Sequence, residues 1–266
     1  MWNRPKRPNG AAERQPPEVP VGLIDAKQSG WYNGATHELL TGFPIHPEDT
    51  VIDVGCGDGM ACGFVAGCGA AVIGVDVDPS KVKTVEKLFR RSRARASLAV
   101  VSNANPLPIR DAVATKVISM EVLEHVDDPS RFLSELVRVG KPGAQYLITV
   151  PDAAAETVQR GLAPPSHWKK PNHIHVFQRD ELDRLVHRAG LEIQRRIHFG
   201  FYWSMWWIFR WVTEGEFRPG TPGGPLLDHW NRTWRAVLAD PEGERVTRAL
   251  NELMPKSQAL VARKAA

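Results

Sequence analysis

Short apolar runs recur along residues 51–150, and the segments between them show a different spacing. The runs lie at 51–54, 71–75, 98–101, 116–120 and 146–150. Continuous runs of this length, closed by Gly, Pro or an acid, predict strands that are buried on both faces of a parallel sheet. Between them, apolar positions such as Phe132, Leu133 and Leu136 recur at helical spacing. Alternating strands and helices predict a doubly wound α/β fold.

The first run leads into a glycine-rich turn. Gly55, Gly57 and Gly59 follow the strand, and Asp53 stands just before the first glycine. Glycine allows positive φ and leaves no Cβ between the backbone and a ligand. The turn therefore predicts a cradle for a nucleotide-like ligand at the carboxyl edge of the sheet. A dinucleotide is disfavoured, because Met60 stands where that fold needs its third glycine.

Acidic side chains mark the ends of further strands. Asp76 ends the second run, where a carboxylate at a strand tip can accept both ribose hydroxyls. Glu121 follows the fourth run in the same way. Asp53 and Asp58 would repel a pyrophosphate but suit a ligand with an ammonium or sulfonium charge. The acids and glycines together indicate a positively charged nucleoside.

Several segments, in order, resemble the class I S-adenosylmethionine-dependent methyltransferases. Asp53 to Gly59 matches the family's (D/E)-x-G-x-G-x-G motif. Residues 122–129 are very similar to the (V)-L-E-H-(V/L)-x-D-P run of its small-molecule branch, which includes ubiquinone- and biotin-pathway enzymes, and residues 173–182 resemble its H-x-F-(S/T)-x-x-E-L segment. The resemblance implies a seven-stranded, mostly parallel, Rossmann-like sheet whose last strand, near 258–264, is antiparallel. It also implies methyl transfer with S-adenosyl-L-methionine as the cofactor.

The same resemblance implies a set of cofactor-binding positions. They are Asp53, Gly55, Cys56, Gly57, Gly59, Asp76, Val77, Asn103, Ala104 and Glu121. Residues 102–108 resemble the D-A-x-x-L-P segment that lies along the adenine in this family, with Asn103 where Asp is usual. An amide oxygen can still accept a hydrogen bond from the adenine amino group, so we expect weaker binding there.

Histidines gather in the segments that should face the methyl acceptor. In a doubly wound sheet the loops after the fourth and fifth strands lie beside the ligand. A neutral histidine suits removal of a proton from a hydroxyl. We expect a general base among His125, His173 and His175, with His167 and His198 as second choices, although each alone is more often structural. The hypothesis that follows is O-methylation of a small acceptor.

An aromatic run at 199–212 opens an insertion, 199–256, ahead of the last strand. The run is too short to span a bilayer. Three interpretations remain open: a buried helix on the sheet edge, a hydrophobic lid over the acceptor pocket, and docking into a membrane interface, where Trp and Arg are favoured. The last two both indicate an apolar or amphiphilic acceptor. Trp31 and Tyr32 either close the cofactor site or pack beneath it.

Three parts of the chain are expected. They are a disordered, Pro-rich tail at 1–20, a methyltransferase domain at 21–198 with 257–266, and an aromatic-rich lid at 199–256. The net charge of +4 comes largely from 81–95, which is typical of a solvated helix face, and no nucleic-acid-binding module is recognisable. The three cysteines match neither a metal pattern nor a disulfide framework. We therefore expect no metal site and a cytoplasmic protein, with peripheral membrane contact as an alternative.

Two other functions compete with methyl transfer. A nicotinamide dehydrogenase is disfavoured by the glycine spacing. A methyltransferase-fold protein without catalysis would serve as a membrane-surface or partner-binding subunit, yet such proteins usually lose the acids and glycines that this chain keeps. The identity of the acceptor and the oligomeric state lie beyond the sequence.

Overall fold

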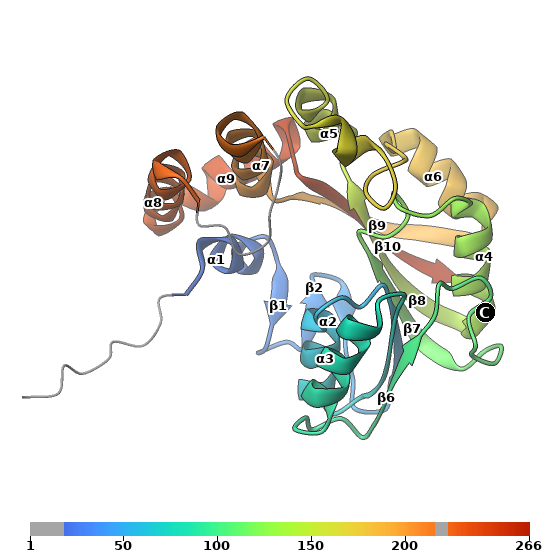
Figure 1. Cartoon of the computed structure of the whole chain (residues 1–266). Coiled ribbons are helices and arrows are strands. Elements are labelled where there is room, and N and C mark those ends of the chain that lie inside the picture. The colour runs from blue at the N-terminus through green and yellow to red at the C-terminus, as the bar shows by residue number, and fades with distance from the viewer. Residues whose placement is uncertain (1–18, 216–222) are drawn as a thin grey trace, which may run out of the picture.

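The computed structural model describes residues 19–215 and 223–266. At its centre is a seven-stranded sheet with the order β6-β5-β4-β7-β8-β10-β9 (Figure 1). Its strands are β4 (Thr50–Val54), β5 (Ala71–Asp76), β6 (Ala96–Val101), β7 (Ala114–Met120), β8 (Gly140–Pro151), β9 (Leu191–Phe199) and β10 (Ser257–Lys264). β10 runs antiparallel to β8 and β9, and the other pairs are parallel. The predicted fold is confirmed, while the predicted tail at 1–20 lies almost entirely outside the described residues.

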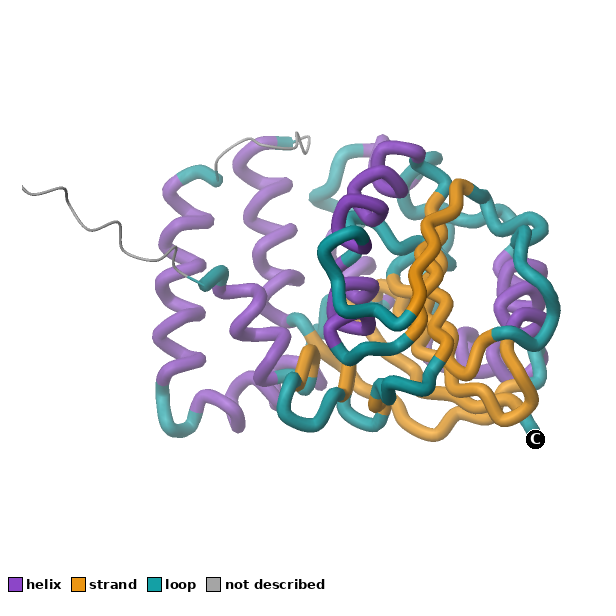
Figure 2. The backbone as a smooth tube through the Cα atoms, turned by 90° about the horizontal axis from the view of Figure 1, so that it is seen from below, coloured by secondary structure: helices purple, strands orange, loops and turns teal. Residues whose placement is uncertain are grey.

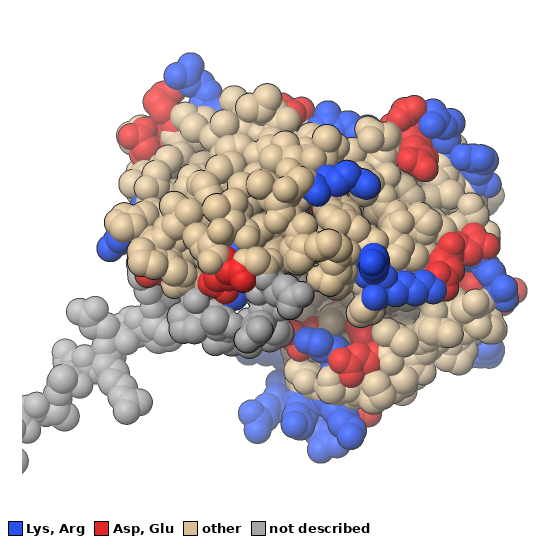
Figure 3. Space-filling view, turned by 45° about the horizontal axis from the view of Figure 1, so that its top comes forward, with Lys and Arg blue, Asp and Glu red and all other residues tan. Residues whose placement is uncertain are grey.

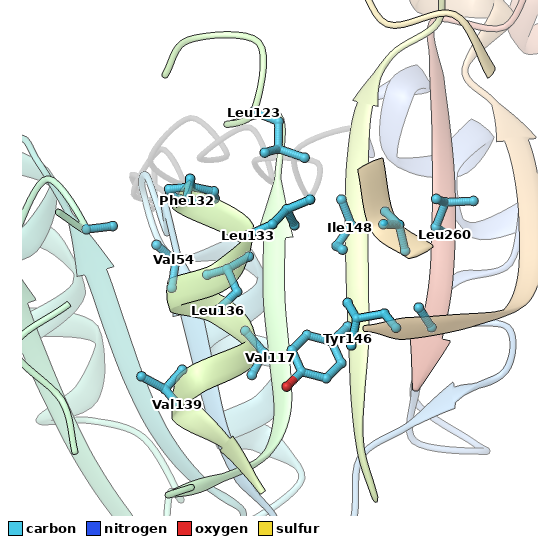
Figure 4. Packing of buried hydrophobic residues seen from close by; sticks show 14 of the residues in the cluster. Val54, Val117, Leu123, Phe132, Leu133, Leu136, Val139, Tyr146, Ile148 and Leu260 are labelled. Atoms are coloured by element: carbon cyan, nitrogen blue, oxygen red, sulfur yellow. The ribbon is translucent and has the colours of Figure 1, made fainter. Parts of the chain in front are cut away.

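Helices cover both faces of the sheet, because successive residues of a buried strand point to opposite sides. These helices are α2 (Met60–Gly67), α3 (Pro79–Phe89), α4 (Pro129–Val139) and α6 (Arg179–Arg188). Ile52 packs with α4 and α6, whereas its neighbour Val51 packs with α2 and α3. Figure 4 shows Phe132, Leu133 and Leu136 of α4 in one cluster with buried side chains of the sheet, among them Val54 and Val117. The sheet therefore packs against a separate hydrophobic core on each of its two faces.

Aspartate side chains cap the N-termini of α3 and α4. Asp78 accepts a hydrogen bond from the Ser80 amide at 2.7 Å, and Asp128 accepts one from the Arg131 amide at 3.0 Å. A proline follows each acid and fits the first helical position. Since both helices follow parallel strands, the caps fix the turns that lie at the carboxyl edge of the sheet.

Several elements were not predicted. The N-terminal part forms α1 (Val21–Gln28) and a small antiparallel sheet of β1 (Trp31–Asn33), β2 (Glu38–Leu40) and β3 (Phe43–Pro44). After β8 come α5 (Ala153–Gln159) and a 3₁₀ turn (Pro165–Trp168). Strands this short carry no readable alternation, which is why the small sheet escaped prediction. β8 also begins before the predicted fifth run, because Gly140 already pairs with Ala114 of β7.

The segment between β9 and β10 is helical. It forms α7 (Phe201–Glu214), α8 (Pro225–Ala239) and α9 (Gly243–Leu253). The chain leaves and rejoins the sheet at one place, because Phe199 of β9 pairs with Ser257 of β10. With α1, these helices form a group beside the sheet (Figure 2). Within the described ranges, no helix is both long and apolar enough to cross a membrane.

A buried hydrogen bond joins α1 to α8. Trp234 Nε1 donates to Asp25 Oδ1 at 2.8 Å, and the Asp25 side chain is 2% exposed. Burial raises the pKa of Asp25 to about 6, although the bond from Trp234 opposes the shift. Because the folded-state pKa lies above the unfolded value, stability falls as pH rises through this window, and the full penalty is present above about pH 6.

We therefore predict that Asp25→Asn stabilises the fold at high pH and has little effect at low pH. The amide keeps an acceptor for Trp234 but carries no charge, so the gain is about 2 kcal/mol near pH 8 and close to zero near pH 4. Urea unfolding of both proteins at the two pH values measures the difference. A loss of stability near pH 8 would contradict the prediction.

Candidate cofactor and acceptor site

The glycine turn after β4 has the backbone that its sequence predicts. Gly55, Gly57 and Gly59 have φ values of 79°, 50° and 83°. A Cβ at Gly55 would lie 2.2 Å from Val122 Cγ2, and one at Gly59 would lie 2.9 Å from Val85 Cγ2. A Cβ at Gly57 would meet no atom of the described chain within 4 Å. Two glycines thus permit packing inside the protein, and Gly57 faces open space that a ligand can fill.

Asp76 ends β5 beside this turn. Its Oδ2 accepts a hydrogen bond from the Gly57 amide at 2.8 Å, and its Oδ1 accepts one from the Asp78 amide at 2.9 Å. Each carboxylate oxygen keeps a further lone pair for a ribose hydroxyl. Val77 and Met60, on either side, are 68% and 65% exposed, and a ligand lying on the turn would cover such apolar side chains. The residues therefore fit a nucleoside.

Asp53 lies beneath the turn rather than at its surface. Its side chain is 2% exposed and accepts a hydrogen bond from Cys62 Sγ at 3.2 Å. Burial raises the pKa of Asp53 to about 6, and the Asp76 charge adds to the shift. Cys56 is also buried. Any effect of Asp53 on a cofactor would act through the turn, since its carboxylate is almost closed to solvent.

The loop after β6 is held by bonds between side chains and the backbone. Ser102 Oγ accepts from the Ala104 amide at 3.0 Å, and Asn103 Oδ1 accepts from the Asn105 amide at 3.1 Å. Ala104 is buried and has a φ of 58°. The amide oxygen predicted to meet adenine therefore already carries one backbone bond, and its second lone pair remains.

Glu121, at the tip of β7, has a φ of 56°, which is uncommon for a residue other than glycine. Its carboxylate accepts hydrogen bonds from Thr149 Oγ1 at 2.8 Å and Ser257 Oγ at 3.1 Å, and it pairs with the Lys256 ammonium. Burial raises the pKa of Glu121, but Lys256 and Thr149 outweigh it, and the net pKa lies below the ordinary value. Thr149, Lys256 and Ser257 were not predicted as site residues.

A cavity of about 980 Å³ adjoins the tips of β4 and β7, where Met60 and Glu121 line it. Its aromatic walls are Trp31, Tyr32, Phe199, Tyr202, Trp203 and Trp207. Trp31 is buried and packs on Phe199 with ring centroids 5.1 Å apart, and both Trp31 and Tyr32 face the cavity. Burial, followed by the Asp53 charge, raises the pKa of Tyr32 to about 12. The aromatic run thus forms a wall of the cavity through α7.

The predicted histidines do not line this cavity. His125 and His173 lie together, with ring centroids 5.1 Å apart, and His167 lies 4.5 Å from His173 by the same measure. His175 Nε2 instead lies 2.9 Å from the Val126 carbonyl, and His198 Nδ1 lies 3.0 Å from Glu252 Oε2. Their role as bases therefore stays a prediction.

Burial lowers the pKa of two histidines of this group and so favours their neutral form. It lowers the pKa of His125, and the neighbouring His173 adds to the shift. It lowers the pKa of His167 to about 4, again with a contribution from His173. The buried carboxyl of Glu124 is affected in the opposite sense: burial and then the Glu121 charge raise its pKa well above the ordinary value.

Comparison with curated proteins supports one family. A methyltransferase-domain model matches residues 31–195. A relative from Mycolicibacterium smegmatis, named as a probable S-adenosylmethionine-dependent methyltransferase, is 31% identical over 171 residues, covering 64% of this chain and 62% of that protein. A ubiquinone biosynthesis O-methyltransferase of Thiobacillus denitrificans is 28% identical over 150 residues, covering 54% of this chain and 65% of its own length. The chain thus spans less than two thirds of these relatives.

A solved structure shows the same fold. The S-adenosylmethionine-dependent methyltransferase from Mesorhizobium loti superposes with a TM-score of 0.55 at 15% identity, covering 82% of this chain and 91% of that one. The strand order, the glycine turn with open space over Gly57, and Asp76 at the neighbouring strand tip agree with this likeness. Since the methyltransferase-domain model covers more than half of its residues, the chain belongs to the class I S-adenosylmethionine-dependent methyltransferases, whose cofactor is S-adenosyl-L-methionine.

Proposed function

We propose that this protein methylates a small apolar or amphiphilic acceptor, at a hydroxyl, inside the aromatic cavity. The observation that carries the proposal is the position of the cavity, whose lining includes Met60 and Glu121 at the strand tips where the cofactor is expected. Its volume of about 980 Å³ is at the upper end of the range for small-molecule sites. The cavity therefore has room for an acceptor beside the methionine part of a cofactor.

The cofactor, when bound, supplies a methyl group on a positively charged sulfur. The turn at Gly57 would let its nucleoside approach the backbone, and the Asp76 carboxylate would accept hydrogen bonds from its ribose hydroxyls. Glu121 and the other acids of this edge favour its positive charge. Val77 and Met60 lose water when they are covered. These residues bind and orient; in-line transfer then needs mainly alignment and exclusion of water.

The residues of α7 and α8 that line the cavity are mostly aromatic, with a few polar groups. Tyr202, Trp203 and Trp207 of α7 supply apolar area, and Asn231 and Arg232 of α8 add polar groups. An acceptor with an apolar body and one polar end suits this combination.

Peripheral membrane contact remains a second proposal for the helical group. Trp203, Val212 and Leu253 are 37%, 63% and 72% exposed. The face in Figure 3 has broad areas without Lys, Arg, Asp or Glu. Exposed apolar area of this kind favours contact with a membrane surface, from which an amphiphilic acceptor could enter.

Methyl-label transfer tests the proposed activity. The full chain is incubated with methyl-labelled S-adenosylmethionine and separate panels of phenolic and quinol-like compounds, lipids and small amines, and product masses are measured. Label in an apolar hydroxyl compound is the expected result. Label in amines alone would contradict O-methylation, and absence of label from every panel would contradict the enzymatic proposal.

For the cofactor site, we predict that Gly57→Ala loses cofactor affinity beyond its effect on stability. The new methyl group would occupy the space above the turn, which should weaken binding by about 100-fold, or about 2.7 kcal/mol. Gly190→Ala is the matched control, because Gly190 also has a positive φ, 85°, and open space around its Cβ position. Both variants should lose about 1–2 kcal/mol of stability. Calorimetric titration with S-adenosylmethionine measures the affinity of each variant. Equal affinity in Gly57→Ala and Gly190→Ala would contradict a cofactor that lies against Gly57.

For the acceptor wall, we predict that Trp207→Ala raises KM for the acceptor by about 10-fold through lost apolar contact, with cofactor affinity unchanged. Trp206→Ala is the control, because Trp206 packs on Trp207 at 5.0 Å between ring centroids but is not part of the cavity lining. Steady-state kinetics with the acceptor found in the screen gives both constants. A larger effect from the control would contradict the assignment of the wall.

The histidine prediction has its own test. If His125, His173 or His175 is the general base, its Ala variant lowers kcat by on the order of 100-fold or more. The variant would also lose the acid limb of the pH–rate profile, since only the neutral imidazole accepts a proton. Unchanged turnover in all three variants would remove histidine from the chemical step.

A further inference from the structure

A cluster of carboxylate and imidazole groups lies outside the cavity lining. Glu124 and His125 come from the turn after β7, and His173 comes from the segment before α6. One potential ligand atom from each of these three lies within 4.8 Å of the other two. His173 also belongs to a second such trio, with Glu156 of α5 and His167 of the 3₁₀ turn. Four separate segments therefore converge at one place.

Within this cluster, Glu124 lacks the contacts that a buried acid needs. It is 0% exposed, and neither carboxylate oxygen has a hydrogen-bond partner among the residues that the structure describes. Its backbone carbonyl accepts from the Ile174 and His175 amides at 2.8 and 3.2 Å, so the residue is held where two segments meet. Glu124 Oε1 lies 3.6 Å from His125 Nε2, which is too long for a hydrogen bond. Buried charges are normally paired or bound to a metal.

The hydrogen bonds of the two histidines leave Nε2 as the ligand atom. His125 Nδ1 lies 3.0 Å from the Pro171 carbonyl oxygen, which can only accept, so Nδ1 carries the proton. His173 Nδ1 lies 2.9 Å from Glu156 Oε2 and is likewise the donor. In a neutral imidazole the other nitrogen then presents a lone pair. A carbonyl or carboxylate on the far nitrogen is the usual support of a metal-binding histidine.

The charges of this region also favour a divalent cation. The Lys256 ammonium interacts with Glu121, Glu124 and Glu156. When all four residues are ionised, the three carboxylates carry three negative charges and the ammonium carries one positive charge, so the group has a net charge of −2. One divalent cation would neutralise the group, and it would lie beside the carboxylate that has no hydrogen-bond partner.

We propose that Glu124, His125 and His173 bind a divalent transition-metal ion, with Glu156 orienting His173. Two imidazole nitrogens and one carboxylate suit zinc-like or ferrous ions better than Mg²⁺ or Ca²⁺, which prefer oxygen. Ligands about 2.1 Å from zinc are roughly 3.4 Å apart in a tetrahedron. The distance of 3.6 Å between Glu124 Oε1 and His125 Nε2 is close to that spacing. The His125 side chain is 34% exposed, which gives the ion and a water ligand access.

Such an ion would be a positioning element. It would join the turn after β7 to the segment before α6, beside the Glu121–Lys256 pair that lines the cavity. In this role His125 and His173 hold a metal through Nε2 and are not bases. The proposal does not depend on the identity of the acceptor.

The experiment uses the full chain, stripped with a chelator and titrated with Co²⁺ while visible absorption and heat are recorded. We expect one Co²⁺ per chain, displacement by Zn²⁺, and a higher thermal midpoint on binding. Glu124→Gln and His125→Ala should each weaken Co²⁺ binding by on the order of 100-fold or more, and Glu156→Gln by about 10-fold. His187→Ala, at an exposed position of α6, is the control and should bind as the wild type does.

Two results would overturn the proposal: no stoichiometric Co²⁺ binding, or wild-type affinity in Glu124→Gln. The Glu124→Gln variant should still fold, because glutamine has nearly the same shape as glutamate and brings no charge into the buried site. In chelator, its thermal midpoint should equal or exceed that of the wild type. A lower midpoint would mean that the carboxylate already has a partner, which contradicts the site. S-adenosylmethionine is titrated into the same samples. Cofactor binding without Co²⁺ binding would overturn the metal site alone, whereas loss of cofactor binding would count against the proposed function.

Discussion

The site depends on three parallel strands that end at one edge of the sheet. β4 pairs with β5 on one side and with β7 on the other, so the glycine turn, Asp76 and Glu121 meet there although they are far apart in the chain. The turn can accept a ligand because Gly57 adopts a positive φ and no described residue lies close to its Cβ position. α1 and α7 then enclose the cavity beside the same edge. The proposed cofactor and acceptor sites thus share one edge of the sheet.

The arrangement of the glycine turn, Asp76 and Glu121 at one sheet edge could be predicted from the sequence, because these groups lie in contiguous segments that follow buried strands. Asp78 and Asp128 show the same for helix starts, since a cap and its helix are neighbours in the chain. Lys256 and Ser257 could not be found in this way. They reach Glu121 only because β10 inserts beside β8, where Ser257 pairs with Pro151. Pairing between distant strands leaves no local pattern.

The aromatic helix shows a second limit of prediction. α7 is apolar around most of its circumference, because Trp203 and Trp207 face the cavity while Tyr202 and Trp211 are buried. Periodicity cannot distinguish a side chain that packs in a core from one that lines a cavity. The histidines show a related limit. His125 of the turn after β7 and His173 of the segment before α6 lie with ring centroids 5.1 Å apart, and their tautomers follow from backbone and carboxylate partners that no local sequence pattern gives.

A crystal structure with bound S-adenosylhomocysteine tests the central claim most directly. The ribose should lie on the Asp76 carboxylate, the nucleoside should cover Gly57, and the sulfur should point into the aromatic cavity near Glu121. Density for the compound elsewhere, or a sulfur directed away from that cavity, would contradict a methyl donor and an acceptor that share this edge of the sheet.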